Sequence, residues 1–200
     1  MAKTEKQKRR ITRADIIPIS DYRAIRKDHR LKLIEIKRRR RMAIGPFMTL
    51  SFENYDTMWM QVHEMLLIEQ GGNDQIDGEL DAYNPLIPGG YELVATMMLE
   101  IEDEKRRQSV LATLGHIEDM ITISFDGEVV NGAPDKDMDR TTDAGKTSSV
   151  HFLHFLFTPA QIEKFQADAP QIIIGCNHQN YRHMAVIPDN VYASLSEDLA

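Results

Sequence analysis

The hydrophobic periodicity of this chain changes near residue 91, and that change limits the folds open to it. Before it, apolar side chains recur every three or four positions along 20–42 and along 54–70, which predicts amphipathic helices. From 91 to 101 the pattern alternates at every second residue, as in a half-buried strand. Helices first and strands later predict an α+β fold, with N-terminal helices and a helical hairpin packed with a mostly antiparallel sheet in the C-terminal half.

Capping and turn motifs set the element boundaries. Asn54 can cap the second helix, which forms the helical hairpin with the shorter helix after it. Asp126-Gly127 predicts a β-hairpin, and Thr158-Pro159 predicts another helix start. Further strands are expected over 150–157, 171–176 and 182–187.

The length of 200 residues fits one domain with an arm. We expect residues 1–10 to form a flexible basic tail and residues 11–200 to form a single α+β domain. That domain is predicted to be helical over about 11–90 and sheet-rich over about 91–200. The polar stretch 131–149 has no periodicity and is expected to be a loop, either functional or disordered.

The composition narrows the cellular setting. No apolar run approaches the roughly 20 residues that span a bilayer. The charged amino terminus is not followed by the apolar segment of a secretory signal, so we expect a cytoplasmic protein without a membrane partner. The lone cysteine, Cys176, excludes an intramolecular disulfide and is expected to be a small buried hydrophobe.

Charge is distributed unevenly along the chain. Residues 1–41 hold sixteen basic and five acidic side chains, whereas the remainder carries a net charge of −18. The basic run could bind nucleic acid or an acidic partner. The run is not accompanied by aromatic or glycine-rich segments that would contact bases, and a basic last turn also complements a helix dipole. Nucleic-acid binding therefore ranks behind a solvated helix face or a contact with the acidic remainder of the chain. The run consists of Lys37, Arg38, Arg39, Arg40 and Arg41.

Four histidines are candidate metal ligands: His151, His154, His178 and His183. A hairpin turning through 179–182 would place His178 opposite His183, at a Cβ separation of about 4.5–5.5 Å that suits two imidazoles on one metal. A third ligand could come from His151 or His154 on the neighbouring strand, or from a carboxylate, giving a site for iron, zinc or manganese. Residues three apart on a strand face opposite sides of the sheet. His151 and His154 could therefore both bind the same metal only if a bulge lay between them.

Other assignments for these histidines stay open. They can be hydrogen-bonded structural residues, or they can transfer protons in catalysis. The helix over 54–70 carries His63 and Glu64, but their order does not match the Glu-x-x-His pairing of a di-iron bundle. Arg140 stands where both a calcium loop and a phosphate loop would need glycine, so the sequence favours neither.

Several strings together resemble a known bacterial family of unknown function, domain of unknown function 3501. The resemblance runs from about Ile11 to the carboxyl end, and the strings are specific for the family but not for a reaction. They are Phe52–Thr57, Ala82–Pro88 and Ser149–Phe155, together with His178, Tyr181 and His183.

The resemblance implies a redox setting, because genes of this family often lie beside those of rubrerythrin-like di-iron proteins and iron–sulfur oxidoreductases. The leading hypothesis is therefore an accessory of an iron-dependent redox or peroxide-detoxifying system, in which His178 and His183, together with His151 or His154, hold one transition metal. Tyr181 and Glu53 would orient these ligands or replace one of them. The alternative is a metal-free adaptor that docks redox proteins through its charged surfaces and helical hairpin. A third hypothesis is a nucleic-acid-binding accessory that uses the basic N-terminal helix.

Overall fold

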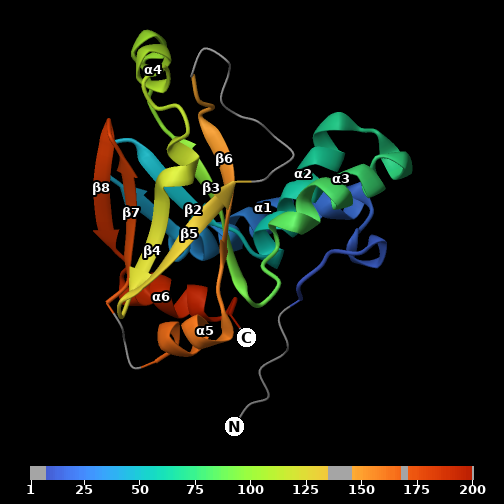
Figure 1. Ribbon diagram of the computed structural model, residues 1–200. Helices are drawn as coiled ribbons and strands as arrows, with labels where there is room; N and C mark the ends of the chain where they lie inside the picture. The colour runs from blue at the N-terminus through green and yellow to red at the C-terminus, as the bar shows by residue number, and fades with distance from the viewer. Residues whose placement is uncertain (1–7, 135–145, 168–170, 200) are drawn as a thin grey trace.

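The computed structural model describes residues 8–134, 146–167 and 171–199, and Figure 1 shows the arrangement of their elements. The helices are α1 (Ile19–Arg38), α2 (Tyr55–Glu69), α3 (Ile76–Tyr83), α4 (Glu104–Leu111), α5 (Pro159–Phe165) and α6 (Asp189–Ser196). The strands are β1 (Arg41–Ile44), β2 (Met48–Phe52), β3 (Glu92–Leu99), β4 (Ile121–Phe125), β5 (Glu128–Pro134), β6 (Val150–Leu156), β7 (Ile173–His178) and β8 (Tyr181–Val186). A short 3-10 turn, η4 (Ile117–Met120), leads into β4.

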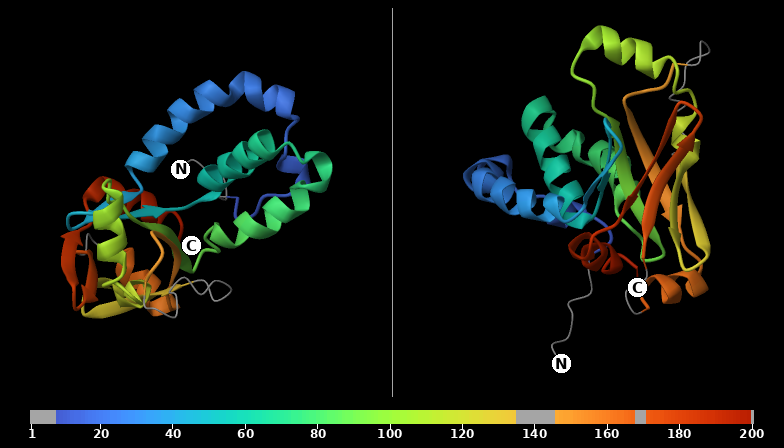
Figure 2. Two further views of the ribbon diagram at one scale, coloured as in Figure 1. Left: turned by 90° about the horizontal axis from the view of Figure 1, so that it is seen from above. Right: turned by 90° about the vertical axis from the view of Figure 1, so that its left-hand side faces the viewer.

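The strands form one antiparallel sheet in the order β1-β2-β3-β6-β5-β4-β7-β8. The sheet curls until β1 and β8 lie side by side (Figure 2). Every second residue of β3 faces the interior of the curl, and this alternation confirms the predicted strand. The prediction of an α+β fold, with helices in the N-terminal part and most of the sheet in the C-terminal part, is likewise confirmed.

Helices α1, α2 and α3 form a helical arm on one side of the sheet, and α4 lies at the opposite end of the curl from α5 and α6 (Figures 1 and 2). The arm has a hydrophobic core of its own, to which β3 contributes Val94 from the outer face of the sheet. Because Val94 is buried there while its neighbours in β3 are buried in the interior, β3 carries apolar residues on both faces.

Predicted caps begin several of these helices. The amide of Thr57 donates to Asn54 Oδ1 at 3.0 Å, and the Thr57 hydroxyl accepts from the Asn54 amide at 2.9 Å. Thr158 caps α5, and Asp103 caps α4 through the amide of Arg106. Each cap satisfies amide groups that have no acceptor within the first helical turn.

Two predicted boundaries were wrong. The first helix ends at Arg38 instead of continuing to residue 42, because Met42 and Ile44 alternate into the core as strand β1. Strand β5 continues to Pro134, so the first residues of the expected loop 131–149 belong to the sheet. The predicted tail, residues 1–10, falls mostly outside the described residues, as do residues 135–145 of that loop.

Within the described residues, no helix combines the length and the apolar character needed to cross a membrane.

Candidate functional site

The two histidines of β6 lie on opposite faces of the sheet. His151 points into the interior and is 1% exposed, whereas the Nδ1 atom of His154 lies 2.9 Å from a carboxylate oxygen of Glu92 on the outer face. The pairing of β6 with β3 is regular from one histidine to the other, with no bulge between them. His151 and His154 therefore do not share a site.

His151 belongs to a buried polar cluster at the start of β6. Its Nε2 atom lies 3.0 Å from the Thr147 hydroxyl and 3.0 Å from the Ser148 carbonyl oxygen. Its Nδ1 atom lies 3.7 Å from the Glu118 carboxylate, which also lies 3.4 Å from the Thr147 hydroxyl. These contacts fix the position of the His151 imidazole at the start of β6.

The other two histidines lie on the β7–β8 hairpin, whose register differs from the prediction. The turn consists of residues 179–180, so His178 faces Tyr181 and His183 faces Cys176. The prediction that the two histidines face each other was wrong, and they are diagonal neighbours on one face of the hairpin. Strands β5 and β4 separate β6 from β7, so the neighbouring-strand position of a third ligand was also wrong.

Among the residues that the structure describes, no three His, Cys, Asp or Glu side chains are grouped as they would be around one metal ion. The two predicted supporting residues have other contacts. Tyr181 donates its hydroxyl proton to the carbonyl oxygen of Ile44 at 2.5 Å and accepts from the amide of Met48 at 3.1 Å. Glu53 is buried and accepts from the Thr96 hydroxyl at 2.7 Å. Tyr181 thus joins the two ends of the curled sheet.

The basic run Lys37–Arg41 does not form one surface. Arg40 is 1% exposed and forms an ion pair with Asp198, so its inclusion in a binding surface was wrong. Arg41 is exposed, but both its contacts go to the Glu100 carboxylate. Helix α1 ends at Arg38, inside this run, and strand β1 begins at Arg41. The side chains of the run therefore leave the backbone in different directions. Lys37, Arg38 and Arg39 are exposed.

A groove of about 300 Å³ lies between α1 and α2 in the helical arm. Arg30 and Lys37 from α1 line it, and both are exposed. Within the described residues, neither cation has a carboxylate within ion-pairing distance. The other lining residues are Leu33, Ile34, Thr57, Met60, Gln61 and Glu64.

Glu64, the carboxylate that lines the groove, is hydrogen-bonded to Arg26 and Tyr22. Its carboxylate accepts two hydrogen bonds from Arg26, at 2.7 Å each, and one from the Tyr22 hydroxyl at 2.6 Å. The Arg26 guanidinium, more than the Tyr22 hydroxyl, lowers the pKa of Glu64 to about 2. The groove therefore presents an excess of positive charge.

Apolar side chains continue this surface on the solvent side of α1. Leu31 and Ile34 are 58% and 59% exposed, although both are large and hydrophobic. They lie three residues apart, on the same side of the helix. The sequence alone could have indicated that these two side chains are exposed, because both residues lie outside the apolar stripe predicted for residues 20–42.

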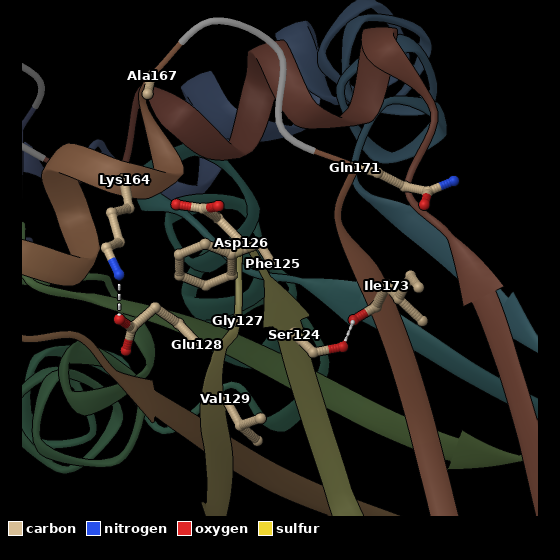
Figure 3. A pocket seen from close by; sticks show the side chains of 10 residues that line it. All are labelled: Ser124, Phe125, Asp126, Gly127, Glu128, Val129, Lys164, Ala167, Gln171 and Ile173. Carbon is tan, nitrogen blue, oxygen red and sulfur yellow. Dashed lines mark hydrogen bonds and ion pairs between the residues drawn. The ribbon is translucent and has the colours of Figure 1, made fainter.

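A larger hollow, of about 800 Å³, lies beside the β4–β5 turn (Figure 3). Lys164 Nζ contacts the Glu128 carboxylate at 2.5 Å, and the two opposite charges offset each other. The Ser124 hydroxyl donates to the Ile173 carbonyl oxygen at 3.4 Å. Because these groups bond to one another, we assign no chemistry to this hollow.

The fold defines an α+β protein in which a helical arm packs on a curled eight-stranded antiparallel sheet. A family model described as "Protein of unknown function (DUF3501)" matches residues 10–199, so the chain belongs to this family. A solved structure of a protein of unknown function from Burkholderia pseudomallei is 39% identical, with a TM-score of 0.88. The match covers 95% of this chain and 99% of that one. Comparison with curated proteins gave no significant match.

Proposed function

We propose that this protein is an adaptor whose helical arm docks an acidic, amphipathic segment of a partner protein. The observation that carries this proposal is the α1–α2 groove, in which Arg30 and Lys37 lie beside the exposed side chain of Ile34, with exposed Leu31 next to it on α1. Carboxylates of the partner would pair with the two cations, and its apolar side chains would cover Leu31 and Ile34. Amphipathic helices commonly bind to grooves in this way.

The same surface favours a protein over nucleic acid. Three of the five residues in the basic run form ion pairs within the chain: Arg38 with Glu35, Arg40 with Asp198 and Arg41 with Glu100. A surface that tracks phosphates depends on many cations and not on exposed aliphatic side chains. Because of the family resemblance, rubrerythrin-like and iron–sulfur proteins are the first partners to test.

Metal binding stays a prediction, now limited to a smaller set of ligands. His178 and His183 share one face of the β7–β8 hairpin, so two imidazoles remain available to one ion. Elemental analysis of untagged protein, with His178→Ala and His183→Ala variants, checks this. Bound iron, zinc or manganese that disappears in both variants would support it.

The docking proposal predicts that affinity depends on the charge of the groove. The probe is a fluorescently labelled acidic amphipathic helical peptide, followed by a purified rubrerythrin-like protein. Arg30→Glu combined with Lys37→Glu should weaken binding at least tenfold, because attraction becomes repulsion. Leu31→Ser combined with Ile34→Ser should also weaken it. Binding is measured by fluorescence anisotropy at low and moderate salt.

The matched control is Lys105→Glu combined with Arg106→Glu, which reverses two exposed charges on α4, outside the arm. This variant has the same net charge as the groove variant, so it reports the effect of overall charge alone. Equal weakening by both charge-reversed variants, or no binding by the wild type, would overturn the docking proposal.

A further inference from the structure

A second concave site lies at the end of the helical arm away from the sheet, where the chain enters α1 (Figure 2). It has a volume of about 470 Å³, within the range typical of small-molecule sites. It shares no lining residue with the α1–α2 groove, so its function can be tested separately. The lining residues are Ile16, Ile17, Pro18, Ile19, Arg23, Leu66, Gln70, Gly72, Asn73 and Ile76.

The walls of this pocket are mainly aliphatic. Three segments of the chain supply them: residues 16–19 before and at the start of α1, Leu66 from α2, and Ile76 from α3. Leu66 is buried, and Ile76 is half-buried. Such walls favour contact with an alkyl group over contact with a polar one.

A cation stands among these apolar walls. Arg23 lines the pocket from α1 and is exposed. In the part of the chain that the structure describes, no carboxylate lies within ion-pairing distance of its guanidinium. A guanidinium matches a carboxylate with two parallel hydrogen bonds. Gln70 and Asn73 add amide groups to the lining.

The segment that forms one wall is fixed by buried contacts. The indole nitrogen of Trp59 donates to the Asp15 carbonyl oxygen at 2.9 Å. The Ile17 amide donates to His63 Nε2 at 3.2 Å, while His63 Nδ1 donates to the Trp59 carbonyl oxygen at 2.8 Å. A wall held in place before binding loses less conformational entropy when a ligand arrives.

We propose that this pocket binds an aliphatic monocarboxylate, with the alkyl chain between the isoleucines and the carboxylate on Arg23. The size of the pocket, its apolar walls and its one unpaired cation together define this ligand class. A neutral apolar molecule would leave the guanidinium unused, and a dicarboxylate would place a second charge against aliphatic side chains.

The experiment is a titration of the full-length protein with octanoate, followed by fluorescence. Trp59 is the only tryptophan of the chain, and its hydrogen bond to Asp15 connects it to the pocket wall. We expect a saturable change in its emission, confirmed by calorimetry. Octanamide, which is neutral and of equal length, should bind at least tenfold more weakly. Arg23→Gln should remove most of that preference.

Two further variants make the outcome decisive. Lys32→Gln removes an exposed cation of the same helix that lines neither the pocket nor the α1–α2 groove, and it should leave octanoate affinity unchanged. Ile76→Phe should lower affinity by filling the pocket while leaving the melting temperature close to that of the wild type. No saturable signal with octanoate, equal affinity for octanoate and octanamide, or full octanoate affinity in Arg23→Gln would overturn the proposal.

Discussion

Arg40 is a buried guanidinium that connects the middle of the chain to its carboxyl end. It donates to the carbonyl oxygens of Phe52 and Glu53 at 3.0 and 2.9 Å, and to that of Ser194 at 3.0 Å. It also forms an ion pair with Asp198, whose side chain is equally buried. Because Phe52, Glu53 and Asp198 are buried, Arg40 satisfies polar groups that would otherwise be desolvated without partners.

Arg40→Ala is therefore expected to lower the free energy of unfolding by about 3–5 kcal/mol, since it leaves the Asp198 carboxylate buried without its cation. The matched control is Arg41→Ala, which removes an exposed pair with Glu100 and should cost at most about 1 kcal/mol. Urea unfolding at pH 7 measures both. Similar losses in the two variants would contradict the assigned role of Arg40.

At the scale of elements, the pairing of α1 with α2 depends on a polar contact as well as on apolar packing. Glu64 of α2 receives hydrogen bonds from Arg26 and Tyr22 of α1. These donors favour the ionised carboxylate and lower its pKa to about 2, mainly through Arg26. The contact fixes the spacing of the two helices and thereby the shape of the groove between them.

This pKa predicts a pH dependence of stability. A carboxyl group with a lowered pKa in the folded state stabilises it fully above its unfolded pKa of about 4.3, and the contribution is lost as the pH falls toward 2. The difference in unfolding free energy between wild type and Glu64→Gln should be constant from pH 7 to about pH 5 and should narrow below that. Urea unfolding at a series of pH values measures it.

An Arg26→Ala background provides the control, because Arg26 is the main cause of the lowered pKa. In that background, the difference in unfolding free energy between the proteins with and without Glu64→Gln should decrease less as the pH falls. A difference between wild type and Glu64→Gln that stays constant down to pH 3 would show that the contact contributes no ionic stabilisation.

For the whole molecule, the decisive feature is the seam where β1 meets β8. Tyr181 bonds there to the backbone of the β1–β2 turn, and its ring lies 4.5 Å from that of His183. Gly45 in this turn has a φ of +71°, and a Cβ atom there would lie 2.5 Å from the His183 ring. Only glycine combines this backbone conformation with such a close approach.

Gly45→Ala should destabilise the protein by about 1–2 kcal/mol through its left-handed backbone alone, and further through the contact with His183. In a His183→Ala background the loss should be smaller, because the ring contact is relieved. A double-mutant cycle on unfolding free energies measures the difference. Strict additivity would mean that the ring does not restrict the turn.

Much of this architecture was predictable from local patterns. The alternation along β3, the caps Asn54 and Thr158, and the Asp126-Gly127 turn act within a few residues, so they are readable in the sequence. Strand β1 was missed because it has only four residues, two of them buried, and follows directly on a basic helix. So short an alternation becomes a strand only when β2 pairs with it.

The candidate sites were less predictable, because their residues come from segments that lie far apart in the sequence. The sequence correctly required His151 and His154 to face opposite ways, since that depends only on strand parity. It did not determine that β5 and β4 would lie between β6 and β7, nor that the turn at residues 179–180 would shift the register of the two remaining histidines. Strand order depends on contacts between distant segments.

The sequence by itself thus determined the fold class, most element boundaries and the family, because periodicity, capping and characteristic strings are local properties. Only the tertiary structure decided which charges remain available. Arg40 and Arg41 follow one another in the chain, yet one is buried on Asp198 and the other is exposed on Glu100. Burial and pairing depend on what the rest of the chain places beside each residue. The groove between α1 and α2 and the pocket at the start of α1 therefore follow only from the packing of the helical arm.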